Sequence, residues 1–470
     1  MESLENKGIV IIGGGPAGYV AAIRAAQLGG RVTLVEADKL GGTCLNRGCI
    51  PTKFMLRSVE TYQSVSLAGR YGVNTSAVNF DIPQMQKGKG QVISALSAGV
   101  KGLLAGNKVM VINGRARFIS PKKLEVDSGQ ETKQIIEADN FIIATGAKPI
   151  KLPIPGADSP DILDVDDLLE MQEIPESIVI IGGGVIGVEM ATVLAKSGCK
   201  VSVVEMLPHC LPTQDDDIAS ILEGVLKKDG ISIYTNSRVS RIEANGAGKK
   251  VIISQGDTET AVEAAAVAIA VGYKPNIDDL GLEECGVTVN KGHIQVNQKM
   301  QTNVPGIYAA GDVVGGMMLA YVAIAEGTTA AENALGENSE IDYNAIPQCI
   351  FTIPEVASVG LTEREAVAQG YSIDIGKFPF AANGMAMIMG EKTGIVKIIA
   401  EQGDGKILGV HIIGPQATTL ISEAATAMKL NAGVDDIIAM IHSHPSLTEA
   451  IWEAAADIRG KAIHMLPRKQ

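Results

Sequence analysis

The sequence is poor in aromatic residues, in positive charge and in long apolar runs. Aromatic side chains make up 4% of the 470 residues, with a single tryptophan, and the formal net charge is −13. A nucleic-acid partner would require aromatic stacking and cations for its phosphates, so these two scarcities exclude that class of partner. No run of 18 apolar residues occurs, and we therefore expect no membrane insertion.

Cysteine is also scarce, and the segment before Gly8 has no apolar stretch. We expect no signal peptide and a cytoplasmic location, where a close cysteine pair favours catalysis over a structural disulfide. Four of the six cysteines are scattered without the spacing of metal ligands, so we interpret them as buried or incidental thiols and expect no metal site. These four are Cys199, Cys210, Cys285 and Cys349.

The chain begins with a pattern typical of a dinucleotide-binding unit. An apolar run at residues 8–12 precedes a G-x-G-x-x-G motif, a helix-forming stretch and a second apolar run. In this order the motif is a strong signal, because Gly13 allows a tight turn, Gly15 lets a pyrophosphate approach the backbone and Gly18 permits close packing of helix on strand. Glu36 ends the second run and would accept hydrogen bonds from ribose hydroxyls.

The same unit recurs between residues 177 and 205, with Gly182, Gly184 and Gly187 followed by Glu205. Two dinucleotide sites in one chain predict two nucleotides, and the natural pair is a flavin and a nicotinamide. No arginine occurs between Glu205 and residue 217, so a 2′-phosphate would meet a carboxylate without a cation. The second site is therefore expected to bind NAD, and the flavin to occupy the first.

Related strand–glycine–Lys-Pro segments end near residues 149 and 275, which indicates that the second unit is inserted into the first. A chain of this length exceeds one hydrophobic core. We predict a first domain at 1–146, an inserted domain at 147–274, a return to the first domain at 275–345, and a C-terminal domain at 346–470. Asp312 follows a buried run in the third segment and is either a ligand-binding acid or a helix N-cap.

Cys44 and Cys49 lie between the two nucleotide units. Residues five apart on a regular helix have Cα atoms about 8.6 Å apart, whereas a disulfide requires less than ~7 Å. A bridge would therefore need a distorted turn, which Gly48 would permit. The pair is either two unconnected buried thiols or a redox-active dithiol, and this stretch alone leaves both interpretations open.

The C-terminal part has no phosphate loop and is predicted to be mixed α/β. We expect strands at 348–353, 356–360, 395–400 and 407–413, and helices at 417–430 and 434–441. Met385, Met387 and Met389 alternate, which favours a further strand.

Two histidines in this part, His442 and His444, precede Pro445 and Glu449. Pro445 is expected at the first position of a helix, and Glu449 would orient His444 and raise its basicity. The alternative is an exposed histidine with a surface acid.

Taken together, the two nucleotide units, the Cys-x4-Cys pair and the His-Glu pair resemble the pyridine nucleotide–disulfide oxidoreductases. The resemblance covers essentially the whole chain, and its specific segments are residues 41–53, 144–146, 310–312, 351–355 and 442–449. It implies an α/β fold with two Rossmann-like dinucleotide-binding domains and a C-terminal α/β dimerisation domain. Among the members, the lipoamide-specific ones are most similar, which implies oxidation of protein-bound dihydrolipoamide with NAD⁺ as the acceptor.

The resemblance also implies roles for individual residues. Cys44 would exchange with the substrate dithiol, and Cys49 would lie against tightly bound, non-covalent FAD as the charge-transfer thiolate. His444, supported by Glu449, would act as acid–base from the other subunit of a homodimer, while Lys53 and Glu189 would pair beside the flavin. Further FAD contacts are implied for Gly42, Thr43, Ala116, Thr145, Gly146, Asp312, Met318, Leu319, Ala320 and Tyr321. NAD contacts are implied for Glu189, Val239 and Gly272.

The implied partners are lipoyl-bearing proteins, either the E2 of 2-oxoacid dehydrogenase complexes or the glycine-cleavage H protein. Two departures from the family pattern are Tyr321, where histidine is usual, and residues 384–386, where Ser-Arg-Ala is common. Rival functions are a glutathione-type reductase, a mercuric-type reductase and a non-catalytic flavoprotein redox sensor. The first would need basic residues after Glu205 and the second a C-terminal cysteine pair, and the sequence has neither.

Overall fold

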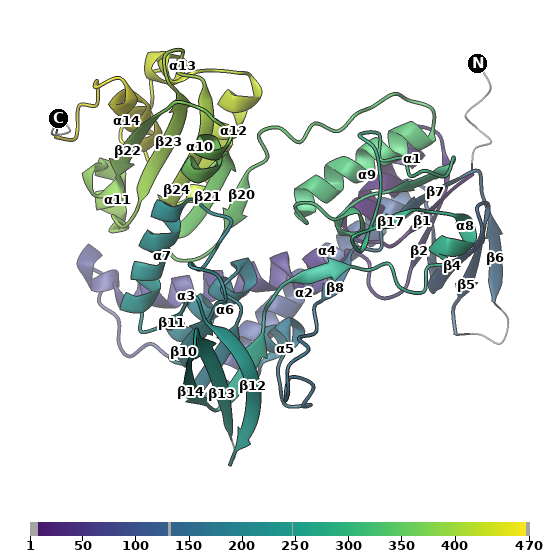
Figure 1. Cartoon of the computed structure of the whole chain (residues 1–470), viewed down its shortest axis with the longest axis horizontal. Coiled ribbons are helices and arrows are strands. Elements are labelled where there is room, and N and C mark those ends of the chain that lie inside the picture. The colour runs from purple at the N-terminus through teal and green to yellow at the C-terminus, as the bar shows by residue number, and fades with distance from the viewer. Residues whose placement is uncertain (1–7, 130–132, 247, 467–470) are drawn as a thin grey trace. The chain divides into compact units, whose positions relative to one another are not determined.

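The computed structural model describes residues 8–129, 133–246 and 248–466 (Figure 1). We predicted the absence of a signal peptide from residues 1–7, and these residues lie outside the described ranges. Within them, no helix combines the length and the apolar character needed to cross a membrane. The chain forms two compact units. One contains residues up to Met55, Asp81–Lys151 and Gly272–Asp342; the other contains Leu56–Phe80, Leu152–Val271 and the residues from Tyr343 onward.

The first unit contains a parallel sheet with the strand order β19-β7-β1-β2-β3. Its strands are β1 (Gly8–Ile12), β2 (Arg31–Glu36), β3 (Met110–Asn113), β7 (Asn140–Ile143) and β19 (Ile307–Ala309). Strand β19 lies far along the chain from β7, so the chain returns to this sheet after the second nucleotide unit, as predicted. The strands that carry the predicted motif are buried, which is typical of parallel sheets covered by helices.

Helices pack on this sheet through small side chains. Helix α1 (Pro16–Gln27) contacts α9 (Ala320–Ala334), and the alanines of both helices lie in one hydrophobic core. Proline at the first helical position costs no hydrogen bond, and alanine is the best helix former. The remaining helices of this unit are α2 (Gly42–Arg47), the start of α3 (Cys49–Ser66), α4 (Ile82–Gly106), α8 (Leu282–Cys285) and the 3-10 helix η3 (Asp312–Val314).

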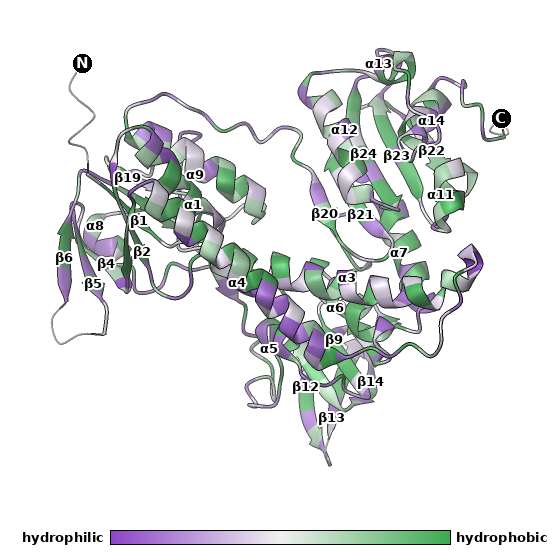
Figure 2. Cartoon of the chain, turned by 180° about the vertical axis from the view of Figure 1, so that it is seen from behind, coloured by the Kyte–Doolittle hydropathy of each residue, from purple (hydrophilic) through white to green (hydrophobic). Residues whose placement is uncertain are grey.

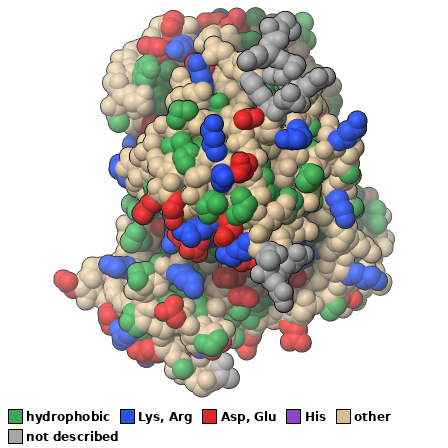
Figure 3. Space-filling view, turned by 90° about the vertical axis from the view of Figure 1, so that its right-hand side faces the viewer, with side chains coloured by type: hydrophobic (Ala, Val, Ile, Leu, Met, Phe, Trp, Pro, Cys, Tyr) green, Lys and Arg blue, Asp and Glu red, His purple; other side chains and the backbone are tan. Residues whose placement is uncertain are grey.

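Further strands of this unit are β4 (Arg115–Ser120), β5 (Lys123–Asp127), β6 (Gln134–Glu137), β17 (Val289–Asn290) and β18 (His293–Ile294). Basic and acidic side chains are interspersed on the face shown in Figure 3. Lys133, just before β6, forms an ion pair of 2.6 Å with Glu125 on β5. The charge pattern of this face therefore gives no sign of a polyanion-binding surface.

The two linkers between the nucleotide units are joined to each other. Strands β8 (Ala147–Pro149) and β16 (Tyr273–Pro275) pair antiparallel, with Lys148 opposite Lys274. Both predicted Lys-Pro segments therefore form strands of one small sheet, which the sequence pattern did not indicate.

The second unit contains the repeated nucleotide fold. Its parallel sheet has the order β11-β10-β9-β15. These strands and their helices are β9 (Ser177–Ile181), α6 (Val185–Lys196), β10 (Lys200–Val204), α7 (Asp216–Lys228), β11 (Ser232–Tyr234) and β15 (Ala266–Ile269). Also in this unit are η2 (Ala68–Tyr71), α5 (Val165–Glu170), β12 (Arg238–Asn245), β13 (Gly248–Gln255) and β14 (Thr258–Ala264).

The C-terminal part of this unit is an antiparallel sheet with the order β20-β21-β24-β23-β22. Its elements are β20 (Gln348–Ile350), β21 (Glu355–Gly360), α10 (Glu363–Ala368), β22 (Ile373–Pro379), η4 (Phe380–Ala382), α11 (Gly384–Met389), β23 (Ile395–Glu401), β24 (Ile407–Gly414), α12 (Ala417–Lys429), α13 (Val434–Ala439) and α14 (Glu449–Ile458). The hydrophobic strands β23 and β24 form its centre (Figure 2).

The four predicted C-terminal strands and two predicted helices are confirmed to within three residues at each end. Strand β22 was not predicted. The strand expected around Met385–Met389 is wrong, because these residues form α11. Asn383 caps this helix by accepting from the Ala386 N–H at 3.0 Å, so a capping signal outweighs the alternating methionines.

Candidate functional site

The first phosphate loop requires glycine at two positions. Gly13 has a φ of +102°, and a Cβ there would lie 2.3 Å from the carbonyl oxygen of Ala144. A Cβ on Gly18 would lie 1.8 Å from the carbonyl oxygen of Gly13. Helix α1 follows with Gly15 as its N-cap, which has no side chain to accept from the first N–H groups. This arrangement presents a helix N-terminus to an anion, as a dinucleotide pyrophosphate requires.

Glu36 is fixed at the end of β2 by the backbone of this loop. Its Oε2 accepts from the Gly14 N–H, and its Oε1 accepts from the Asp38 N–H at 2.6 Å. Burial raises the pKa of Glu36, and the hydrogen bond from Gly14 opposes that shift. Its position beside the phosphate loop fits a role in holding the ribose of a dinucleotide.

The second loop repeats this geometry. Gly182 has a φ of +113°, and a Cβ on Gly187 would lie 2.0 Å from the carbonyl oxygen of Gly182. Gly184 is the N-cap of α6. Glu205 accepts from the Gly183 N–H at 2.7 Å and from the Leu207 N–H at 2.8 Å. Both predicted units thus have the same arrangement of glycines and terminal acid.

The other predicted NAD contacts have different surroundings. Glu189 is buried in α6, and its Oε1 accepts from the Phe351 N–H at 2.9 Å. Val239 is buried in β12, and Gly272 has a φ of +100° and accepts from the Ile150 N–H at 3.0 Å. Because Lys53 and Glu189 belong to different compact units, their pairing stays a prediction.

The cysteine helix starts against the first phosphate loop. Gly41, with a φ of +94°, is the N-cap of α2, and Gly42 follows with a φ of +59°. A Cβ on Gly42 would lie 2.6 Å from the Cα of Gly15. Two glycines therefore bring the backbone of the cysteine segment into contact with the loop that would hold the pyrophosphate. Thr43 follows directly in α2.

The distorted turn expected at Gly48 is confirmed. Gly48 separates α2 from α3 with φ −144° and ψ −107°, which is outside the helical region. The Cys44 sulfur is hydrogen-bonded to the thiol and to the backbone N–H of Cys49. Neither cysteine forms a disulfide in this structure. The two sulfurs are therefore in contact, which favours the redox-active dithiol over two unconnected thiols.

The electrostatics of the dithiol favour one ionised thiol over two. The pKa of Cys44 is raised by the hydrogen bond with Cys49, by burial and by the charge of Cys49, while the Lys53 ammonium opposes the shift. Tyr19 also lies close enough for the Cys44 charge to raise its pKa, after the larger effect of burial. The sequence analysis missed Tyr19, because a tyrosine one position after the G-x-G-x-x-G motif carries no recognisable signal.

Gly42→Ala tests the contact between the cysteine helix and the phosphate loop. We expect the purified variant to lose most of its bound FAD, because the methyl group would force Gly15 away from the pyrophosphate position. The measurement is the ratio of flavin absorbance to protein. The matched control is Gly29→Ala, since Gly29 has a φ of +85° but a Cβ there would meet nothing within 4 Å. Equal flavin loss in both variants would attribute the effect to backbone strain alone.

The remaining predicted FAD contacts lie in the first unit. Thr145 Oγ1 donates to the carbonyl oxygen of Asn276 at 2.8 Å, and Gly146, with a φ of +69°, accepts from the Asn276 N–H at 2.9 Å. The segment after β7 is therefore tied to the returning linker. Ala116 is buried in β4.

Asp312 begins η3 and is not a helix cap. The N-cap of η3 is Gly311 and that of α9 is Leu319, so the N-cap alternative is wrong. Burial raises the pKa of Asp312, and a hydroxyl donor from a ligand would stabilise its carboxylate. Met318, with a φ of 48°, precedes Leu319, and Ala320 and Tyr321 form the first turn of α9.

Two cavities adjoin the end of β3 at Asn113. The larger has a volume of about 600 Å³, and the smaller, of about 400 Å³, is lined by the segment just before Ala116 and by the residue after Glu36. Ala37, Gly114 and Arg115 line the smaller cavity, and the sequence analysis did not identify them because this lining combines strands that are distant in the sequence.

The predicted contact between His444 and Glu449 is present, while its acid–base role stays a prediction. His444 Nδ1 and Glu449 Oε1 are 2.9 Å apart, and Glu449 Oε2 accepts from the Ser446 N–H at 2.9 Å. Partial burial raises the pKa of Glu449, but the hydrogen bonds from His444 and Ser446 lower it overall. The His444 side chain is 78% exposed. The expectation that Pro445 begins a helix is wrong, because α14 begins at Glu449 with Thr448 as its N-cap.

His442 differs from His444 in being enclosed. Its Nε2 lies 2.9 Å from Glu423 Oε1 on α12, and its side chain is 7% exposed. This contact makes His442 a structural residue. In the described part of the chain, no group of three or more His, Cys, Asp or Glu side chains has the geometry of a metal site.

Comparison with known proteins agrees with this geometry. Residues 7–327 match the pyridine nucleotide-disulphide oxidoreductase family, and residues 346–455 match its dimerisation domain. A dihydrolipoyl dehydrogenase of Bacillus subtilis is 43% identical over 458 residues, covering 97% of this chain and 99% of that protein. The mitochondrial dihydrolipoyl dehydrogenase of Pisum sativum is 40% identical over 466 residues, covering 98% and 93%.

Among solved structures, LpdA from Mycobacterium tuberculosis matches with a TM-score of 0.88 and 31% identity, covering 96% of this chain and 99% of that one. The fold therefore consists of two Rossmann-like nucleotide-binding parts and a C-terminal α/β dimerisation domain. With family matches over both parts and relatives similar along nearly the whole length, the chain belongs to the pyridine nucleotide-disulphide oxidoreductases.

Proposed function

We propose that this protein is a dihydrolipoyl dehydrogenase, which oxidises protein-bound dihydrolipoamide to lipoamide and reduces NAD⁺ to NADH. The observation that carries the proposal is the Cys44–Cys49 dithiol, closed by the turn at Gly48 and set against the first phosphate loop. Relatives named for this activity are 40–43% identical over nearly the full length, which supports the choice of substrate.

The family uses FAD and NAD, and both predicted sites fit these groups. Gly13, Gly15 and Gly18 leave room for a pyrophosphate, while Glu36 and Asp312 supply carboxylates for hydroxyl groups. The second loop offers Glu205 and no nearby arginine, which suits the ribose of NAD. When bound, the flavin supplies a two-electron carrier between a dithiol and a nicotinamide.

The side chains of the protein supply thiol exchange and proton transfer. With Cys44 and Cys49 joined as a disulfide, a substrate thiolate attacks the Cys44 sulfur and releases Cys49 as a thiolate. The second substrate thiol then attacks the mixed disulfide, which releases oxidised lipoamide and leaves two electrons on the enzyme dithiol. His444, oriented by Glu449, takes the substrate thiol proton at Nε2, the ring nitrogen that does not bond Glu449.

The assembly proposed for this reaction is a homodimer in which His444 serves the dithiol of the partner subunit. The match of residues 346–455 to a dimerisation domain supports the dimer. The proposed substrate carriers are lipoyl-bearing proteins, either an E2 component or an H protein, and the proposed location is the cytoplasm. The 78% exposure of His444 in the single chain is consistent with a group completed by another subunit.

Anaerobic addition of dihydrolipoamide and NAD⁺ to the purified yellow protein is expected to yield NADH together with long-wavelength thiolate–flavin absorbance. The structural reason is that Cys49 becomes a thiolate when Cys44 exchanges. NADPH-dependent turnover of glutathione disulfide, with no NADH from dihydrolipoamide, would instead indicate a glutathione-type reductase. Flavin reduction without turnover of any disulfide would indicate a redox sensor.

A further inference from the structure

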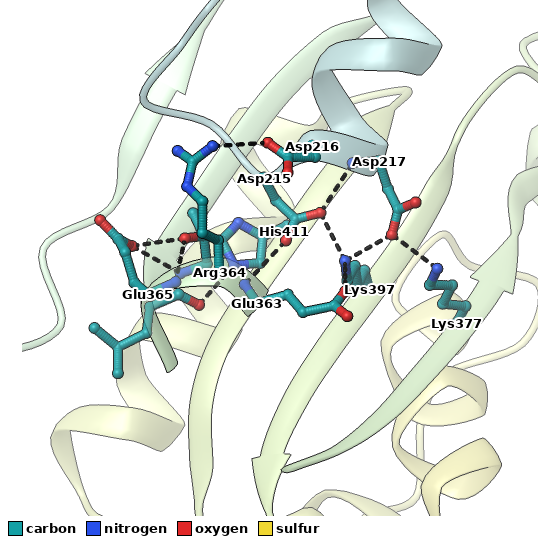
Figure 4. A network of polar contacts seen from close by, with 11 residues as sticks. Asp215, Asp216, Asp217, Glu363, Arg364, Glu365, Lys377, Lys397 and His411 are labelled. Carbon is teal, nitrogen blue, oxygen red and sulfur yellow. Dashed lines mark hydrogen bonds and ion pairs between the residues drawn. The ribbon is translucent and has the colours of Figure 1, made fainter. Parts of the chain in front are cut away.

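A lysine is buried in the C-terminal sheet with all of its donors engaged. The Lys397 side chain on β23 is 1% exposed. Its Nζ donates to Asp215 Oδ1 at 2.7 Å, to Asp217 Oδ2 at 2.6 Å and to Glu363 Oε2 at 2.7 Å (Figure 4). An ammonium has three N–H donors, so each one meets a carboxylate. Burial alone would lower the pKa of Lys397, but these hydrogen bonds raise it overall.

Two of these carboxylates stand at the start of α7 in the second nucleotide fold. Asp215 is the N-cap of α7, is itself 1% exposed and accepts with its Oδ2 from the Glu363 N–H at 3.1 Å. Gln214, one residue earlier, donates from Nε2 to Gln348 Oε1 on β20 at 3.1 Å. The start of α7 is therefore attached to the C-terminal sheet at two consecutive residues.

The loop that leads into α7 also contacts the second phosphate loop. This ribose loop, residues 205–215, begins with Glu205, which accepts from the Gly183 N–H. Farther along, the Leu211 N–H donates to the Gly183 carbonyl oxygen at 2.8 Å, and the Cys210 N–H donates to Glu223 Oε1 at 2.9 Å. The ribose loop is thus held at one end by Gly183 and at the other by the C-terminal sheet.

We propose that Lys397 is a positioning residue for NAD: by fixing Asp215 it holds the ribose loop, and through that loop Glu205 and Gly183, in the arrangement that binds the dinucleotide. Lys397 lies in the segment that matches the dimerisation domain, so that domain determines nicotinamide affinity as well as assembly. The inference rests on the proposed function in one respect, the assignment of NAD to the second fold.

The test compares variants of the full-length, FAD-loaded protein. Lys397→Met alone leaves the buried Asp215 carboxylate without its cation, which penalises folding. The double variant Lys397→Met/Asp215→Asn removes both charges, and asparagine remains a good N-cap. In the double variant Asp217 retains its ion pair with Lys377, which has a length of 2.7 Å, and the Glu363 side chain is 45% exposed to solvent. The double variant therefore leaves no buried carboxylate of this network without a partner.

The matched control is Lys196→Met. Lys196 is 6% exposed and pairs with Asp229 at 2.8 Å, at the opposite end of α7 and away from the ribose loop. Folding of each variant is checked by thermal melting and by the fluorescence of Trp452, whose Nε1 donates to the Ile438 carbonyl oxygen at 2.9 Å in the C-terminal part. The control removes a comparable buried lysine pair without touching the proposed connection.

Calorimetric titration with NAD⁺ is expected to give a Kd about tenfold higher in the double variant than in the wild type and the control. The KM for dihydrolipoamide should stay within about twofold of the wild-type value, because the proposed role of Lys397 concerns the NAD site. A general structural defect would instead change the constants for both substrates. An unchanged NAD⁺ Kd in the folded double variant, or an equal rise in the control, would overturn the inference. Wild-type protein that binds NAD⁺ but does not oxidise dihydrolipoamide would refute the proposed function while leaving this comparison decisive.

Discussion

Cys44→Ser is expected to lower dihydrolipoamide-dependent NADH formation by at least about 10³-fold while retaining the long-wavelength thiolate–flavin absorbance. The serine hydroxyl would not form the mixed disulfide, but Cys49 would remain free to ionise beside the flavin. The Cys44 and Cys49 thiols are hydrogen-bonded to each other, and the substitution removes the Cys44 member of this pair. The measurements are steady-state kinetics and the absorbance spectrum of the same preparation.

Two further variants make this prediction specific. Cys49→Ser should lose both turnover and the absorbance band, and Cys349→Ser, a half-buried thiol on β20, should lose neither. Loss of the band in Cys44→Ser with its retention in Cys49→Ser would show that the roles of the two thiols are reversed. A fully active Cys44→Ser would remove the dithiol from the reaction altogether.

His444→Gln is expected to lower kcat/KM for dihydrolipoamide by about 10²–10⁴-fold, the usual contribution of a general acid–base. The amide can accept a hydrogen bond but does not take up the substrate thiol proton near neutral pH. Flavin content and melting temperature should hardly change, since within its own chain the side chain bonds Glu449 and takes no part in the predicted FAD site. Stopped-flow reduction by dihydrolipoamide would locate the loss in the thiol-exchange step.

The chain offers a close control for this substitution. His464 Nδ1 lies 2.6 Å from Glu453 Oε1, and the imidazole is 69% exposed, so this pair has the same type of contact as His444–Glu449. Glu453 is more buried than Glu449, and the charge of His464 also contributes to lowering the pKa of Glu449. His464→Gln should leave turnover within about twofold of the wild type. Comparable losses in the two variants would mean that an exposed His–Glu pair matters only for the stability of the C-terminal part.

Much of the site could be predicted because it depends on local backbone constraints. Gly13, Gly18 and Gly48 stand where a Cβ would collide or where the helix must break, and such positions leave a direct mark in the sequence. The repeated order of strand, glycine loop, helix and acid likewise predicted both parallel sheets. Local patterns therefore sufficed for the phosphate loops and for the dithiol.

Interactions between distant segments could not be predicted in this way. Lys397 lies in a β-strand between apolar residues, and only the fold brings it to Asp215, 182 residues earlier in the chain. The His464–Glu453 pair shows the converse, because it has the same Nδ1–Oε1 contact as His444–Glu449, so this contact alone does not identify an acid–base pair. Local signals also competed at α11, where the cap at Asn383 outweighed the alternation of the methionines.

The antiparallel pairing of β8 with β16 has a consequence for the modular construction of the chain. Lys148 and Lys274 are opposite each other, so everything between these strands leaves and re-enters the first unit at neighbouring points. The entropic cost of closing a flexible loop depends only weakly on the length of the loop, since each doubling of the length adds about 0.6 kcal/mol. The segment between β8 and β16 is thus an insertion whose two ends are paired with each other. Insertions or deletions within this segment would leave the register of the first sheet unchanged.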